Sequence, residues 1–373
     1  MHAIDVSGNP SRGATTDFLG TANFLLWELR RRGSADNGSD MFQVYVTDHL
    51  TPPATLEEQE LSGLATVKCL LAKSPKDLMG STRDANALIV FHEVSVPAEV
   101  IHNLERCQVI VRGGVGYDNV DLQAAGARGI LVCNVPDYGV DEVADHALML
   151  TLACNRGLAR TERGLIRSLK PWDFHAVEPV PRLVGKTMGI VGLGRIGAAM
   201  ALRAKALRMN VIACDPYLRP GLDKCFGVPL VDLDTLLTQS DVVSLHTPLT
   251  EETRHLINAR TLAQMKKSAL LINTARGAVI DTHALAQALE NGMIAGAGID
   301  VLPHEPPDTS EPLIRLWQQT DPIVNLIITP HTAFYSEEGS VEMRSKAAQE
   351  VARVLRGERP RNCVNQEWLK KRQ

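Results

Sequence analysis

The residues best suited to bind a phosphate group form a glycine-rich turn. The turn is Gly192-Leu193-Gly194-Arg195-Ile196-Gly197. An apolar stretch at 187–191 precedes it and a helical pattern at 198–207 follows it. The first glycine permits a tight turn, the second lets the backbone approach a pyrophosphate, and the third lets helix and strand pack closely. The helix N-terminus would face the anion, so the motif predicts a dinucleotide site that includes Arg195 and Ile196.

One acidic residue indicates which dinucleotide binds. Asp215 follows the next apolar stretch, 210–214, and lies 21 residues after Gly194. An acid about 20 residues after the glycines binds the ribose hydroxyls of NAD. Its charge would repel a 2′-phosphate, so Asp215 favours NAD(H) over NADP(H). An ordinary tight turn would also explain the glycines, but it leaves Asp215 without a role.

Three further polar stretches each follow an apolar stretch, at 273–277, 300–306 and 329–333. Each carries a side chain suited to acid–base or charge chemistry, and the three considered first are Arg276, Glu305 and His331. Ligands of an open α/β sheet bind outside the carboxyl ends of its strands. We therefore expect the three side chains to lie near a bound nicotinamide.

These residue types suit hydride transfer to a 2-keto acid. Arg276 would bind the carboxylate and polarise the carbonyl, because a guanidinium binds oxygens through two parallel hydrogen bonds. His331 would donate the proton, since an imidazole changes charge near neutral pH. Glu305 would orient the ring and favour its charged form. Taken singly, each residue has another interpretation: a surface arginine, an exposed loop glutamate, and a histidine that only satisfies hydrogen bonds at a strand end.

Short apolar stretches alternate with helical patterns along most of the chain. They lie at 42–46, 65–71, 87–91, 109–112 and 130–133 and, after a long helical stretch at 140–167, at 187–191, 210–214, 242–246, 269–273, 296–300 and 326–329. Strands that alternate with helices predict parallel sheets. The predicted fold is therefore α/β, with two doubly wound, Rossmann-like domains and the active site in the cleft between them.

The same pattern predicts the domain boundaries. Residues 1–39 form an extension with an amphipathic helix at 15–32 and a flexible linker. A substrate domain comprises residues 40–136 and 338–373, and it includes the end of a final helix expected at 336–355. The dinucleotide domain comprises residues 137–337.

Composition excludes several classes of protein. Lys+Arg 39 against Asp+Glu 43 gives a net charge of −4, which disfavours nucleic acid as a partner. Seven widely spaced cysteines without a CxxC pair indicate reduced thiols and no metal site. The chain starts without a signal-peptide pattern and has no apolar run long enough for a membrane helix. We expect a cytoplasmic protein with no membrane partner.

Taken together, the motifs resemble the D-isomer-specific 2-hydroxyacid dehydrogenases over about residues 85–365. The resemblance implies that Arg276, Glu305 and His331 are catalytic and that the product is a D-2-hydroxy acid. Other roles are also implied by the resemblance. Asp300 would bind the nicotinamide carboxamide, and the residues lining the nucleotide would be Thr247, Pro248, Thr274 and Ala275.

The stretch from Arg112 to Asp121 is similar to the substrate loop of this family. Backbone N–H groups of Val115 and Gly116 would hold the substrate carboxylate, and Gly114 would allow close approach. Arg112, His92 and Phe334 are further residues expected to line the substrate. A plain glycine turn is the alternative for this loop, and a core or surface histidine is the alternative for His92.

Within the family, the nearest likeness is to the C-terminal-binding proteins, which are dehydrogenase-like corepressors. It rests on 133–140, 215–218, 255–258, 334–338 and 361–365. This chain differs from the corepressors in two features. Its first 80 residues do not resemble theirs, and Phe334 stands where they have a tryptophan. The alternatives to an enzyme of 2-keto acids are thus an NAD(H)-sensing binding protein and a dehydrogenase of a phosphorus-containing acid. Relatives dimerise through the region near Val140, which implies a homodimer.

Overall fold

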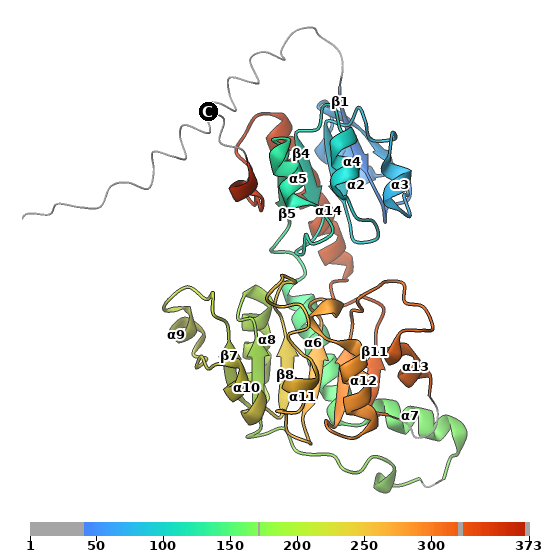
Figure 1. The fold of residues 1–373 in the computed structure, drawn as a ribbon, viewed down its shortest axis with the longest axis vertical. Coiled ribbons are helices and arrows are strands. Elements are labelled where there is room, and N and C mark those ends of the chain that lie inside the picture. The colour runs from blue at the N-terminus through green and yellow to red at the C-terminus, as the bar shows by residue number, and fades with distance from the viewer. Residues whose placement is uncertain (1–40, 171, 320–323, 370–373) are drawn as a thin grey trace, which may run out of the picture. The chain divides into compact units, whose positions relative to one another are not determined.

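The computed structural model describes residues 41–170, 172–319 and 324–369, and these residues divide into two compact units. Unit 1 comprises residues 41–113, 119–134 and 345–369, and unit 2 comprises residues 114–118, 135–170, 172–319 and 324–344. Each unit has its own parallel sheet (Figure 1). The helix expected at 15–32 lies outside the described residues. Within them, no helix has the length and apolar character needed to cross a membrane.

Unit 1 is built on a five-stranded sheet with the order β2-β1-β3-β4-β5. Its strands are β1 (Phe42–Val46), β2 (Ala65–Cys69), β3 (Ala87–Val90), β4 (Val109–Arg112) and β5 (Leu131–Asn134). The helices are α2 (Thr55–Glu60), α3 (Pro75–Leu78), α4 (Ala98–Asn103), α5 (Leu122–Ala127) and the second half of α14 (Glu337–Leu355). The core beneath α4 and α5 includes Leu88, Ile101 and Ile110, all fully buried.

Unit 2 has a six-stranded sheet with the order β11-β10-β9-β8-β6-β7. Its strands are β6 (Thr187–Val191), β7 (Asn210–Cys214), β8 (Val242–Leu245), β9 (Leu270–Asn273), β10 (Gly296–Ile299) and β11 (Leu326–Ile328). Its helices are α6 (Val140–Asn155), α7 (Leu158–Arg167), α8 (Arg195–Ala206), α9 (Leu222–Phe226), α10 (Leu233–Gln239), α11 (Ala259–Leu262), α12 (Thr282–Glu290), α13 (Pro312–Gln318) and the start of α14.

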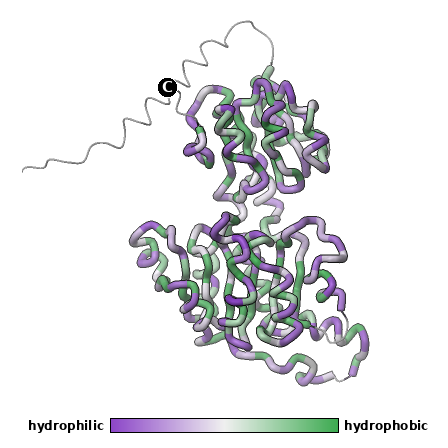
Figure 2. The backbone as a smooth tube through the Cα atoms, viewed as in Figure 1, coloured by the Kyte–Doolittle hydropathy of each residue, from purple (hydrophilic) through white to green (hydrophobic). Residues whose placement is uncertain are grey.

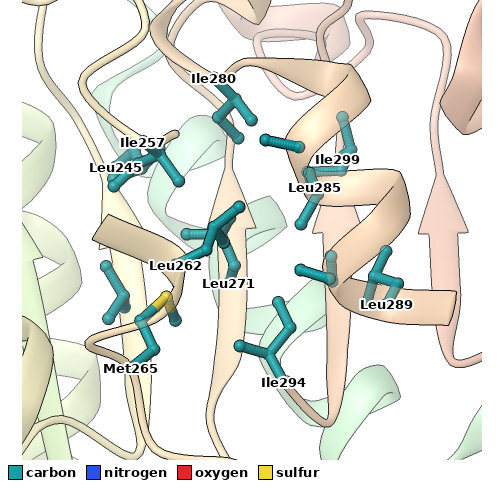
Figure 3. Packing of buried hydrophobic residues seen from close by; sticks show 14 of the residues in the cluster. Leu245, Ile257, Leu262, Met265, Leu271, Ile280, Leu285, Leu289, Ile294 and Ile299 are labelled. Carbon is teal, nitrogen blue, oxygen red and sulfur yellow. The ribbon is translucent and has the colours of Figure 1, made fainter. Parts of the chain in front are cut away.

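Alternate residues of these strands enter two different cores. Leu270 and Ile272 of β9 pack in the cluster that includes α6 and α8. Leu271, between them, packs in the cluster with Leu262 of α11 and Leu285 of α12, as Figure 3 shows. Figure 2 shows hydrophobic segments along the strands of both units. A sheet buried on both faces requires continuous apolar strands, which explains the runs seen in the sequence.

The predicted alternation of strands and helices is confirmed, since every predicted apolar stretch overlaps one of the strands. The helical stretch expected at 140–167 is confirmed, and it consists of two helices, α6 and α7. Gly157 between them has a φ of +64°, which a continuous right-handed helix cannot accommodate. The loop 114–118, expected in the substrate domain, belongs to unit 2.

Candidate active site

The glycine turn joins β6 to α8 at the carboxyl end of the sheet of unit 2. Gly192 has a φ of +90°, and a Cβ there would lie 2.7 Å from the His246 carbonyl oxygen. A Cβ on Gly197 would lie 2.0 Å from the Gly192 carbonyl oxygen, so helix and strand meet at backbone distance. A Cβ on Gly194 would meet nothing within 4 Å. The first and third glycines therefore build the turn, and the second leaves space at the start of α8.

Asp215 lies next to this turn because β7 pairs with β6. Its Oδ2 accepts a hydrogen bond from the Leu193 N–H at 2.9 Å, and its Oδ1 accepts one from the Tyr217 N–H at 3.0 Å. The carboxylate is partly exposed. These two bonds fix a negative charge at the edge of the open space.

Residues after β8 and β9 complete this part of the site. A Cβ on Gly192 would lie 3.0 Å from the Thr247 nitrogen, which places Thr247 and then Pro248 beside the turn. Thr274 is buried, and no residue in the described part of the chain gives its hydroxyl a hydrogen-bond partner. The N–H of Ala275 donates to Asn273 Oδ1 at 3.0 Å. An unpaired buried hydroxyl, an open glycine and a helix N-terminus fit a bound dinucleotide.

Arg276 crosses the backbone of the glycine loop 114–118. Its Nε donates to Asp118 Oδ1 at 2.9 Å, and its Nη1 donates to the Ala275 carbonyl oxygen at 2.7 Å. A Cβ on Gly116 would lie 1.4 Å from Arg276 Nη2. The glycine therefore makes room for the guanidinium. Sequence reasoning missed Asp118, although it lies in the same glycine-rich stretch.

The loop with Arg276 packs directly against the loop that leads to Glu305. A Cβ on Gly277 would lie 2.0 Å from the Leu302 carbonyl carbon. The Leu302 N–H donates to Glu305 Oε1 at 2.8 Å. The arginine and the glutamate are thus fixed by backbone contacts of adjacent loops.

Glu305 and His331 form a close ion pair or hydrogen bond, with 2.6 Å between Glu305 Oε2 and His331 Nδ1. An ionised carboxylate only accepts, so Nδ1 carries a proton. His331 has a φ of +53°, and its N–H donates to the Asp300 carbonyl oxygen at 2.8 Å. The edge of the Phe334 ring faces the imidazole at a centroid distance of 6.1 Å. The structure brings these three predicted residues together.

The Asp300 carboxylate is the centre of the loop that carries His331. Its Oδ1 accepts from Thr329 Oγ1 at 2.5 Å and from the Thr332 N–H at 3.0 Å, and its Oδ2 accepts from the Ala333 N–H at 3.0 Å. The side chain has an exposed fraction of 0%. Contact with a nicotinamide carboxamide stays a prediction, whereas these bonds show that Asp300 holds the loop.

His146 of α6 extends this network and was missed at the sequence level. Its Nε2 lies 2.9 Å from Thr329 Oγ1 and 3.4 Å from Asp300 Oδ1. Burial lowers the pKa of His146, although the Asp300 charge partly opposes this. Because the Thr329 hydroxyl donates its single proton to Asp300, His146 Nε2 must be the donor to Thr329. A histidine in a helical stretch gives no signal of this contact in the sequence.

The other predicted substrate residues divide between the units. Val115 is partly exposed, and the Gly114 carbonyl oxygen accepts from the Val135 N–H at 3.0 Å, both within unit 2. Arg112 and His92 belong to unit 1. Arg112 is buried and donates to the Gly113 carbonyl oxygen at 2.9 Å. The His92 ring lies 5.2 Å from the His49 ring.

Within the described residues, no group of three or more His, Cys, Asp or Glu side chains could hold a metal ion. The doubly wound sheet, the glycine turn and the Arg276, Glu305 and His331 loops define a dinucleotide-binding α/β oxidoreductase. A model of the D-isomer-specific 2-hydroxyacid dehydrogenase family, NAD-binding domain, matches residues 148–333.

Two relatives have similar sequences. A glyoxylate reductase of Korarchaeum cryptofilum is 38% identical over 334 residues, which cover 88% of this chain and 98% of the relative. A D-3-phosphoglycerate dehydrogenase of Methanocaldococcus jannaschii is 38% identical over 329 residues, covering 87% of this chain. The match spans only 60% of that second relative.

The fold of this chain is also similar to that of a solved structure. The D-lactate dehydrogenase of Aquifex aeolicus, complexed with NAD and lactic acid, superimposes with a TM-score of 0.76 at 30% identity, over 84% of this chain and 96% of that one. The chain belongs to the D-isomer-specific 2-hydroxyacid dehydrogenase family. It is therefore an NAD(P)-dependent oxidoreductase of 2-hydroxy and 2-keto acids.

The contact between Gly116 and Arg276 predicts the effect of one added methyl group. Gly116→Ala would displace the guanidinium, because the new Cβ would lie 1.4 Å from Nη2. We expect kcat/KM for the keto acid to fall by roughly tenfold or more, with unchanged NADH affinity. Gly164→Ala is the matched control, since its Cβ meets nothing within 4 Å. Equal kinetics for both variants would show that the guanidinium position does not matter.

Proposed function

We propose that this protein catalyses reversible hydride transfer between NADH and a 2-keto acid, giving a D-2-hydroxy acid. The observation that carries the proposal is the pair of His331 and Glu305, joined at 2.6 Å, with the loop that leads to Glu305 packed against the arginine loop. A fixed cation beside a proton donor is what reduction of a carbonyl next to a carboxylate requires.

The dinucleotide supplies the hydride when it is bound. Its pyrophosphate would lie at the N–H groups that begin α8, near Arg195 and Ile196, over the open space at Gly194. Asp215 would accept hydrogen bonds from the ribose hydroxyls, and its charge supports NAD rather than NADP. Thr247, Pro248, Thr274 and Ala275 would line the remaining part, with the unpaired Thr274 hydroxyl as a polar contact.

Arg276 would bind the substrate carboxylate and polarise the carbonyl that accepts the hydride. Asp118 holds its Nε, so the outer face of the guanidinium keeps a fixed direction. Backbone N–H groups of Val115 and Gly116 would add donors to the carboxylate. A cation and amides set in place before the reaction stabilise the developing alkoxide without reorganisation.

His331 would protonate the alkoxide. Because Glu305 occupies Nδ1, we propose that Nε2 faces the substrate. The Glu305 carboxylate stabilises the imidazolium and fixes the ring, while the Leu302 N–H fixes the carboxylate. In the reverse direction the same Nε2 accepts the proton from the hydroxy acid.

The ribose contact proposed for Asp215 predicts cofactor selectivity. Asp215→Ala removes the charge that repels a 2′-phosphate, so the ratio of kcat/KM with NADH to that with NADPH should fall by about tenfold or more. Steady-state kinetics with both cofactors measures the ratio. The matched control is Asp223→Ala on α9. An unchanged ratio would mean that another residue distinguishes the ribose of NADH from that of NADPH.

The function itself is tested by His331→Ala. NADH oxidation is followed with glyoxylate, pyruvate, hydroxypyruvate, phenylpyruvate, a methylthio keto acid and a phosphonate analogue. The wild type should turn over at least one keto acid, and the variant should lose about 10²-fold or more in kcat because the proton donor is missing. NADH affinity should not change. His283→Ala, at an exposed position of α12, is the control.

The same assay separates the alternatives. Tight NADH binding without turnover of any member would contradict the proposal and favour a binding protein like the C-terminal-binding corepressors. Turnover of the phosphonate analogue alone would favour a dehydrogenase of phosphorus-containing acids. Normal turnover by His331→Ala would remove the histidine from the acid role.

We also propose a homodimer, supported by apolar side chains around α7. Ile166 has an exposed fraction of 80%, and Leu169, Trp172 and Phe174 are also exposed. Adjacent exposed apolar residues mark association sites. Light scattering should give twice the chain mass of 40.7 kDa, and Ile166→Glu combined with Trp172→Glu should give the monomer. Leu202→Glu, at an exposed site on α8, is the control. A monomeric wild type would contradict the proposal.

A further inference from the structure

Two thiols of unit 1 face each other across a pair of antiparallel segments. Residues 362–364, after α14, run alongside β5. The Asn134 N–H donates to the Asn362 carbonyl oxygen at 3.2 Å, and the Val364 N–H donates to the Val132 carbonyl oxygen at 2.8 Å. Cys133 and Cys363 form the bridge between these two bonds. They are therefore a non-hydrogen-bonded pair, the type in which facing side chains approach most closely.

This pairing has the geometry that a disulfide needs. Cα atoms of such a pair lie about 4.5 Å apart, and disulfides join Cα atoms about 4.4–6.8 Å apart. Cys363 Sγ also lies 3.3 Å from Asn365 Oδ1, which accepts from the Val132 N–H, so this thiol is held beside β5. A bond between the sulfurs would therefore require little movement of the backbone.

The C-terminal segment is anchored on both sides of Cys363. Asn365 Oδ1 accepts from the Val132 N–H at 2.9 Å, and Asn365 Nδ2 donates to the Ile130 carbonyl oxygen at 2.9 Å. Glu350 Oε1 accepts from the Arg361 N–H at 2.6 Å. Because these bonds fix the register, the two cysteines face each other as a lasting feature of unit 1.

The chemistry of the pair is asymmetric. The hydrogen bond from Cys133 lowers the pKa of Cys363 to about 7, although burial opposes this. The same hydrogen bond, together with burial, raises the pKa of Cys133. Cys363 is partly exposed and Cys133 is buried. By contrast, burial raises the pKa of Cys107 and Cys154 to about 12. Cys363 is thus the thiol suited to attack from solution at neutral pH.

We propose that Cys133 and Cys363 form a redox modification site that takes a low-molecular-weight disulfide, such as glutathione disulfide, as its oxidant. The Cys363 thiolate attacks one sulfur of the oxidant, forms a mixed disulfide and releases one thiolate. Cys133 then attacks Cys363 Sγ, expels the second thiolate and gives up its proton to it. The protein loses two electrons and two protons, and the oxidant becomes two thiols.

The disulfide would link the C-terminal segment covalently to β5. It closes a long loop, so the oxidised protein should resist unfolding better than the reduced protein. The wide spacing of the cysteines along the chain predicted reduced thiols. The pairing of the C-terminal segment with β5 is what brings two of them together.

The full-length protein tests this in buffers with decreasing ratios of reduced to oxidised glutathione. Thiols are counted after denaturation, peptides are mapped by mass spectrometry, and Tm is measured. We expect two thiols to disappear together, a cross-linked peptide joining Cys133 to Cys363, and a Tm higher by several degrees. Dithiothreitol should reverse all three changes.

Three variants separate the steps. Cys133→Ser should stop at a mixed disulfide on Cys363, and Cys363→Ser should keep its Cys133 thiol. Cys225→Ser, at the exposed cysteine of α9, should behave like the wild type. Wild-type protein that keeps both thiols under conditions that modify Cys225 would overturn the proposal, as would cross-links among other cysteines. If Cys133→Ser does not fold, the wild type and Cys363→Ser decide the question.

Discussion

One buried carboxylate organises the chemistry of unit 2. Asp300 is fully buried, and an ionised carboxylate away from water is tolerated only when several donors surround it. Thr329 and the N–H groups of Thr332 and Ala333 supply them. Those donors lie on both sides of His331, so the bonds that satisfy the buried charge also fix the backbone of the histidine proposed as proton donor.

The order of strands in the sheet places the other residues of the site. The strands β9, β10 and β11 are neighbours in the sheet and all run in one direction, so the loops that follow them leave from a single edge. Arg276, Asp300 and His331 lie just beyond those three ends. On the other side of β9, the strands β8, β6 and β7 bring Thr247, the glycine turn and Asp215 to the same edge. Parallel pairing thus collects residues that are far apart in the chain into a side proposed to bind the cofactor and a side proposed to carry out catalysis.

Much of this arrangement could be predicted from the sequence, because its signals are local. Apolar runs mark the strands, and the glycine spacing marks a strand–turn–helix unit whose steric demands the structure shows at Gly192 and Gly197. The break at Gly157 could not be predicted, since a glycine within a helical pattern is often tolerated. The contacts of Asp118 with Arg276, of His146 with Thr329 and of Cys133 with Cys363 join distant segments. These contacts form only in the folded chain, so the periodicity and spacing of residues in the sequence cannot predict them.

The role of the Asp300 carboxylate is tested by Asp300→Asn, with kcat and the NADH dissociation constant measured. The variant keeps the shape of the side chain but removes its charge and turns one acceptor into a donor that faces N–H groups. We expect kcat to fall by about 10²-fold, because the loop with His331 shifts, while unit 2 stays folded and NADH affinity changes far less. A kcat within twofold of the wild type would contradict the claim that this carboxylate sets the catalytic geometry.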